Sequence, residues 1–218
     1  MKRNAIIRII AWTVSLVILV GLLVAGMNWF RPFGFHSMET TITSVPADGS
    51  ALTEFSGDVQ EIEIDWVSGN IRLAPANVSS IEVRESSVED AKYAMVCKQE
   101  GQTLKIEYCK NTTFGDLKNL KFSKDLTILV PMDWSGRAVK VDAASAKLVV
   151  QDLTIQEVEI DTASGESRFE SCTVDTLDID TASGDVYFEG SLNRLDCDSA
   201  SAGVQAVLDN VPYEIDMD

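Results

Sequence analysis

The chain has 218 residues, and its 34 acidic side chains outnumber its 18 basic ones to give a formal net charge of −16. A protein with this much negative charge repels nucleic-acid phosphates and attracts cations or basic polymers. We therefore expect no nucleic-acid partner. The only histidine, His36, lies outside the region expected to fold, which excludes a Ser-His-Asp or Cys-His catalytic arrangement within that region.

The N-terminal segment predicts a membrane anchor. Residues 1–8 are a basic tail, and residues 9–27 carry no charge over 19 positions, long enough for a helix to cross a hydrocarbon core of about 30 Å. Basic residues favour the cytoplasmic side, so we expect a single-pass cell-membrane protein with a cytoplasmic N-terminus and an extracytoplasmic remainder. The alternative is a signal peptide cleaved near Val24-Ala-Gly26.

Residues 28–50 contain Pro32 and Pro46 and predict a juxtamembrane stalk, and residues 51–218 predict one all-β domain. The alternation over 62–73 predicts a first coil of strand, and Ile81 restarts it 19 residues after Ile62. Segments 93–97 and 104–108 flank Glu100-Gly101 as a hairpin that would pair Cys97 with Leu104. Residues 126–131 predict a further buried strand.

A repeat dominates the C-terminal part. Aspartates recur with spacings of 19, 19, 18 and 18 residues, at Asp142, Asp161, Asp180, Asp198 and Asp216. A fixed period of this length indicates a solenoid, with coils at 139–157, 158–176, 177–194 and 195–212 and a fifth beginning at Tyr213. Two apolar columns should face the core: Val139, Val158, Leu177, Leu195 and Tyr213, and Val141, Ile160, Ile179, Cys197 and Ile215. A third inward point should reach Val211 in the last full coil. The sequence thus predicts a β-solenoid of 18–19-residue coils, preceded by a transmembrane helix.

The repeated aspartates permit two interpretations. Each carboxylate can accept hydrogen bonds from the backbone of its own turn, at corners where Gly165 and Gly184 supply backbone freedom. Alternatively, the stacked carboxylates of Asp161, Asp180 and Asp198 form a calcium column. Turn capping is favoured because the glycine-rich nonapeptide of calcium-binding β-rolls is absent, so we expect no metal and no cofactor.

Two tryptophans are candidate ligand contacts. Trp66 and Trp134 occur in similar contexts, Asp65-Trp-Val-Ser-Gly and Asp133-Trp-Ser-Gly. Such a side chain either stacks on a sugar ring or covers the core at an end of the stack.

The four cysteines have no metal-site spacing. Cys172 and Cys197 fall in inward columns and predict buried apolar side chains, while Cys97 and Cys109 lie on the two arms of the hairpin. Export would permit a disulfide, which the sequence leaves open.

At the C-terminal side, Tyr213 and Ile215 begin a coil without its corner and second strand. Either longer relatives complete it, or this edge accepts a partner strand or a second copy of the chain.

The strand 126–131, followed by Ile160-Asp-Thr-Ala-Ser-Gly and Ile179-Asp-Thr-Ala-Ser-Gly, resembles the bacterial putative-adhesin family, a domain of unknown function over roughly residues 50–218. Domains of this kind also occur in Lia-type cell-envelope stress proteins. The resemblance implies an envelope-exposed β-solenoid without cofactor or catalytic residues, although Ala146 and Ala202 replace the corner glycine.

We therefore expect a non-enzymatic, membrane-anchored binding or scaffolding protein of the bacterial cell envelope, with an envelope protein or wall glycan as partner. Two alternatives stay open. One is a polysaccharide-active enzyme, since solenoids can carry catalytic carboxylates. The other is a regulator that holds an envelope-stress partner through strand pairing.

Overall fold

The computed structural model describes residues 38–41, 51–55, 58–86, 93–109 and 123–217. Within these ranges no helix is long and apolar enough to span a membrane. The expected anchor at 9–27, its alternative cleavage site and His36 lie outside them.

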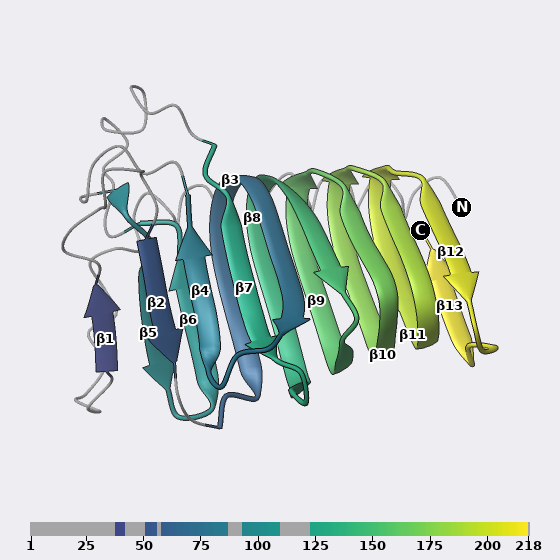
Figure 1. Ribbon diagram of the computed structural model, residues 1–218. Coiled ribbons are helices and arrows are strands. Elements are labelled where there is room, and N and C mark those ends of the chain that lie inside the picture. The colour runs from purple at the N-terminus through teal and green to yellow at the C-terminus, as the bar shows by residue number, and fades with distance from the viewer. Residues whose placement is uncertain (1–37, 42–50, 56–57, 87–92, 110–122, 218) are drawn as a thin grey trace. The chain divides into compact units, whose positions relative to one another are not determined.

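All regular structure described is β, and thirteen strands form one hydrogen-bonded sheet that folds on itself (Figure 1). The strands are β1 (Met38–Thr41), β2 (Ala51–Phe55), β3 (Glu61–Ala76), β4 (Ile81–Glu85), β5 (Val96–Glu100), β6 (Thr103–Glu107), β7 (Leu126–Pro131), β8 (Ser135–Gln151), β9 (Thr154–Ser164), β10 (Ser167–Ser183), β11 (Val186–Ser201), β12 (Val204–Leu208) and β13 (Glu214–Met217).

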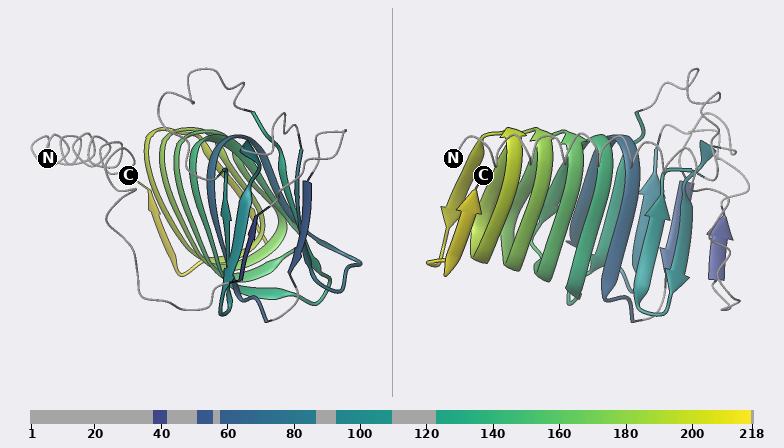
Figure 2. Two further views of the ribbon diagram at one scale, coloured as in Figure 1. Left: turned by 90° about the vertical axis from the view of Figure 1, so that its left-hand side faces the viewer. Right: turned by 180° about the vertical axis from the view of Figure 1, so that it is seen from behind.

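The predicted coils are confirmed from β8 to β11. These strands pair in parallel with equivalent repeat positions side by side, for example Ile160 with Ile179 and Ile179 with Cys197. Both predicted inward columns are buried from Val139 to Cys197, because alternate side chains of each strand point into the coil. β3 joins the same stack, pairing with β8 from Ile62 opposite Val139 onward. Figure 2 shows the coils edge-on and end-on around one apolar core.

Corner glycines are required by close packing between coils. Gly184 has a φ of +148°, and a Cβ placed on it would lie 1.9 Å from the carbonyl oxygen of Gly165. Gly165 stands in the same relation to the carbonyl of Ala146. A side chain at either glycine would therefore push neighbouring coils apart.

The N-terminal end of the stack is closed by further strands: β6 and β7 pair in parallel with β3, and antiparallel strands continue the sheet beyond them. On one side β3 is followed by β6, β5 and β1, and on the other by β7, β4 and β2. The prediction that Ile81 restarts a coil is wrong, because β4 pairs antiparallel with β2 and β7. β1 pairs with β5, so residues 38–41 of the expected stalk belong to the sheet.

The predicted hairpin exists, but its turn lies one residue later. Glu100 pairs with Thr103 and Cys97 with Ile106, not with Leu104. The reason is that Gly101, with a φ of +63°, occupies the first turn position, where a left-handed backbone is needed.

A buried ion pair lies inside this closed end. Lys124 and Glu85 are 4% and 1% exposed and contact each other directly. The Lys124 ammonium also donates to the carbonyl oxygens of Tyr93 at 2.7 Å and Tyr108 at 2.5 Å, and Glu85 accepts from the Met95 amide at 2.9 Å. Burial raises the pKa of Glu85 and lowers that of Lys124, while their attraction opposes both changes. The pair has the further hydrogen bonds that a buried ion pair requires.

The C-terminal end has no such closure among the described residues. The fifth coil is displaced from the predicted register, because Ile215 pairs with Leu195 and Met217 with Cys197. Asp216 therefore aligns with Asp196, not with Asp198, and Tyr213 lies outside the apolar column.

The displacement arises in the segment before β13. The Asn210 side chain accepts a hydrogen bond from the Leu192 amide at 2.9 Å and donates one to the Leu192 carbonyl at 3.0 Å. These two bonds take the place of the backbone hydrogen bonds that a paired strand would make to Leu192. The prediction that Val211 points inward is wrong, since it is 92% exposed.

Candidate functional site

The main candidate site is the outer face of the side on which β6, β3, β8, β9, β10 and β11 pair in parallel. Alternate residues of each strand point outward there, and the in-register pairing aligns equivalent positions. One row across the strands consists only of acids, at a strand spacing of about 4.8 Å. This carboxylate row is Glu107, Asp65, Asp142, Asp161, Asp180 and Asp198.

A second row runs beside it, two residues earlier in each strand. Towards the N-terminal end it alternates in charge, with Lys105 3.0 Å from Glu63 and Lys140 2.5 Å from Glu159. Towards the C-terminal end it is wholly acidic and consists of Asp178, Asp196 and Asp216. The negative charge of the face therefore increases along the stack.

The carboxylate row is not engaged in turn capping. Within the described part of the chain, none of its aspartates uses its carboxylate in a hydrogen bond or ion pair. Other side chains hold the corners: the Thr162 hydroxyl donates to the Ser164 carbonyl at 3.0 Å, and Asp185 accepts from the Gly203 amide at 3.0 Å. The favoured interpretation of Asp161, Asp180 and Asp198 as turn caps is therefore wrong.

Burial, and then the proximity of like charges, shifts the pKa of these carboxyl groups. Partial burial and neighbouring carboxylates raise the pKa of Asp65, Asp161 and Asp178. The largest resolved effect in the row is at Asp180, where burial first, and then Asp161 and other aspartates, raises the pKa to about 6. The row is therefore electrostatically unfavourable in the absence of a cation.

A shallow depression of about 330 Å³ lies on this face. It spans β6, β3, β8 and β9, with Lys105 and Lys140 on one side and Asp65, Asp142 and Asp161 on the other. Among the described residues no group of three or more His, Cys, Asp or Glu side chains converges as a metal site would. The in-line arrangement suits an extended cationic ligand better than a single ion.

The two candidate tryptophans have structural roles. Trp66 is 1% exposed, so of the two alternatives it covers the core and is not available to stack on a sugar ring. Its indole N–H donates to the Lys124 carbonyl at 3.1 Å, and its ring lies edge-on to Tyr108 at 5.0 Å. In the next coil the position that pairs with Trp66 is held by the smaller Ala143.

Trp134 is partly buried. Its indole N–H donates to the Val59 carbonyl at 2.8 Å, and its ring lies against Gly136, where an added Cβ would come within 2.3 Å. The ring lines a second shallow pocket with Asp58 and Asp133. Trp134 therefore keeps an accessible edge, although its polar atom is already used.

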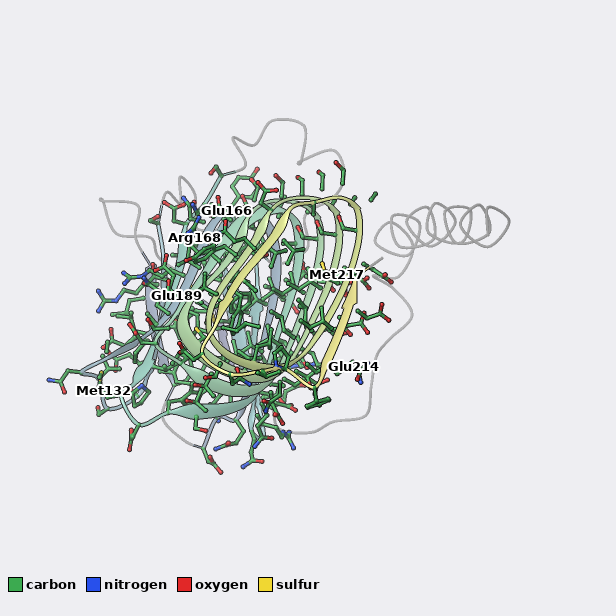
Figure 3. The ribbon with its side chains drawn as sticks, turned by 90° about the vertical axis from the view of Figure 1, so that its right-hand side faces the viewer. Met132, Glu166, Arg168, Glu189, Glu214 and Met217 are labelled. Atoms are coloured by element: carbon green, nitrogen blue, oxygen red, sulfur yellow. The ribbon has the colours of Figure 1, made fainter. Side chains whose placement is uncertain are left out.

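The predicted edge residues are exposed. Tyr213 and Ile215 are 73% and 51% exposed, and neither has a neighbouring coil on its outer side in the described structure. Figure 3 looks onto this end, with Glu214 and Met217 near the two ends of β13. Sequence reasoning missed Met217 as a second inward-facing residue of the edge, because it assumed an unbroken period of 18 residues.

None of the four cysteines forms a disulfide in the structure. Cys97, Cys172 and Cys197 are buried, and Cys109 is partly so. Burial raises the pKa of the Cys97 thiol to about 12, which opposes formation of a reactive thiolate.

The family follows from the same residues that build the stack. The pattern of the Toastrack DUF4097 family matches residues 59–209. The chain belongs to this family. The match begins just before β3 and ends just after β12, so β1, β2 and β13 lie outside the matched residues.

One of the similar solved structures supports the fold. A crystal structure of a putative cell adhesion protein from Clostridium sporogenes is similar with a TM-score of 0.50 at 9% identity, covering 78% of this chain and 99% of that one. A putative adhesin from Bacteroides fragilis gives a TM-score of 0.38 at 10% identity, covering 80% of this chain and all of that one. No curated protein matches the chain. At 9% identity the likeness to the Clostridium structure concerns the fold alone.

Proposed function

We propose that this Toastrack protein is a membrane-anchored, extracytoplasmic binding or scaffolding protein of the bacterial cell envelope, and that its acidic face binds an extended cationic partner. The uncharged run at 9–27, preceded by basic residues, supports the anchor and its orientation. The adhesion-related descriptions of similar structures are consistent with a binding role at the envelope.

One observation supports the choice of ligand. The carboxylate row runs without interruption across six strands, and within the described residues none of its aspartates forms a salt bridge, although Lys140 lies near enough to Asp161 to lower its pKa slightly. Burial is the largest cause of the raised Asp180 pKa, and repulsion by neighbouring aspartates adds to it; a cationic chain lying across the strands would relieve that repulsion. An envelope protein segment or a wall polymer bearing amino groups has the required charge and reach.

The binding test uses the full chain in detergent and a labelled lysine decapeptide, with a glutamate decapeptide as charge control. Replacing Asp142, Asp161 and Asp180 by Asn should weaken lysine-peptide binding about tenfold or more at low salt, because three adjacent charges are lost. The matched control replaces Asp133, Asp175 and Asp209, which lie off the row, and should weaken binding much less. Equal losses in both triple variants would show non-specific attraction and contradict the proposed site.

The topology test is a reporter fused after residue 60. It should be active only outside the cytoplasm and remain with the membrane fraction. A released, shortened chain would indicate cleavage and contradict the anchor.

A further inference from the structure

The C-terminal edge offers a second, separate surface. Within the described residues, β12 and β13 each pair with β11 alone, so one side of each strand has unpaired backbone groups. Ile215 and Met217 continue buried columns, yet they are 51% and 58% exposed because no further coil covers them. A free strand edge combined with exposed core side chains is the combination that a further strand can satisfy.

The charge of this edge restricts what can bind. Residues 195–217 contain five acids and no basic residue: Asp196, Asp198, Asp209, Glu214 and Asp216. The nearest cation is Arg194, whose guanidinium lies 3.5 Å from both Asp196 and Glu214. A second copy adding through the same edge would bring the acids of its own edge against these, and like charges opposite each other oppose strand pairing.

The outward and inward residues of β13 alternate. Asp216 continues the second outer row beside Asp196, and Glu214 lies opposite Arg194, while Ile215 and Met217 point towards the core. A strand that pairs with β13 in the parallel register of the coils would place alternate side chains on these same two faces. Its complementary pattern is apolar residues alternating with Lys or Arg.

We propose that an extended segment of a partner protein, in which apolar residues alternate with Lys or Arg, adds to the free edge of β13 as the next strand. Its apolar side chains cover Ile215 and Met217, and its basic side chains lie beside Glu214 and Asp216. This site does not depend on the acidic face being a binding surface, because it requires backbone pairing at one strand.

The test uses the full chain in detergent and a labelled decapeptide that alternates valine with lysine. Two control peptides have glutamate in place of lysine, or proline in place of the central valine, which prevents ladder pairing. Binding is followed by fluorescence anisotropy, and hydrogen exchange locates the protected amides. The valine–lysine peptide should protect residues 214–217, and both control peptides should bind at least about tenfold more weakly.

Charge-reversed variants separate this site from the acidic face. In the E214K/D216K variant, affinity for the valine–lysine peptide should fall at least about tenfold, and affinity for the glutamate peptide should rise. D142K/D161K is the matched control, because it makes the same charge change on the acidic face at β8 and β9, which do not pair with β13. It should change affinity less than about threefold.

Three results would overturn the proposal. Equal losses in the two double variants would place the peptide on the acidic face, which would leave the proposed function intact. Self-association of the chain that the valine–lysine peptide displaces would make the occupant a second copy. Absence of protection at 214–217 would exclude strand addition.

Discussion

The two ends of the stack differ in how the apolar core of the last coil is covered. At the closed end, antiparallel strands continue both sides of the sheet, and Trp66, Tyr108 and the Lys124–Glu85 pair fill the space inside. At the open end, β13 leaves Ile215 and Met217 exposed. A repeat covers each coil with the next one, so only a non-repeating segment or another molecule can cover the last coil. The two ends of the stack therefore differ in the surface that they expose, whereas the inner coils resemble one another.

The largest expected effect is at the closed end. Lys124→Met leaves the Glu85 carboxylate buried without its counter-charge and should lower the free energy of unfolding by about 3–5 kcal/mol. Arg194→Met removes the exposed ion pairs at the open end and should cost less than about 1 kcal/mol. Denaturant unfolding measures both variants. Similar losses would mean that the closed end owes little to its ion pair.

The second comparison uses one apolar column. Leu177 and Ile215 occupy the same inward column, the first in an inner coil and the second at the edge. Leu177→Ala should cost about 2–5 kcal/mol by leaving a cavity, whereas Ile215→Ala should cost less than about 1 kcal/mol because its side chain is half exposed. Thermal and denaturant unfolding check the pair. An equal loss at Ile215 would indicate that the open end is covered in solution.

The third comparison concerns corners. Gly184→Ala puts a side chain at a φ of +148° and against the Gly165 carbonyl, and should cost more than about 1 kcal/mol. At Gly203, near the open end, an added Cβ meets only the Asp185 carboxylate, at 3.0 Å. Gly203→Ala should therefore change stability by less than about 0.5 kcal/mol. A destabilised Gly203 variant would show that the last corner is packed as tightly as the inner ones.

The smallest effect is a pH dependence in the carboxylate row. The folded-state pKa of Asp180 is raised to about 6 by burial and by Asp161, Asp178 and Asp198, so the folded state binds a proton more readily than the unfolded state. Stability should then rise as pH falls from about 7 towards the unfolded pKa near 4, the reverse of a salt-bridged carboxylate.

The melting temperature measures this effect. It should increase modestly from about pH 7.5 to about pH 5, and Asp180→Asn should reduce the increase while stabilising the domain at neutral pH. A melting temperature that falls continuously with pH in the wild type would contradict the assignment. Millimolar calcium separates charge relief from a specific site, since relief by screening alone should raise the melting temperature only slightly.

Much of the stack could be predicted because its signal is repeated. Val139 to Cys197 alternate at constant spacing, and each coil confirms the register of the next. The closed end could not be predicted in this way, because Ile81 has the alternation of a coil strand and only tertiary pairing decides that β4 runs antiparallel. The register of the open end was mispredicted because the Asn210 side chain, and not a strand backbone, makes the hydrogen bonds to Leu192. This breaks the period of the coils without changing the residue pattern.

The sequence predicted where the aspartates of the candidate site lie, but not that their carboxylates project outward without capping the turns. The aspartates were found by their period, yet local hydrogen bonding could not be distinguished from outward projection, because both are compatible with Asp before a small-residue corner. Trp66 was ambiguous for a similar reason. Its neighbours in sequence match those of Trp134, while its burial depends on Tyr108 and Lys124, which are distant along the chain.

Because the coils pair in register, the length of the stack is proportional to the number of coils. Each coil contacts only the coils on either side of it, and each adds one strand spacing of about 4.8 Å between the closed end and β13. Adding or removing a whole coil would therefore move the open edge in fixed steps and lengthen or shorten the carboxylate row by one charge, without altering the packing of the coils that remain. The length of the stack and the number of carboxylates in the row therefore both change by one step for each coil.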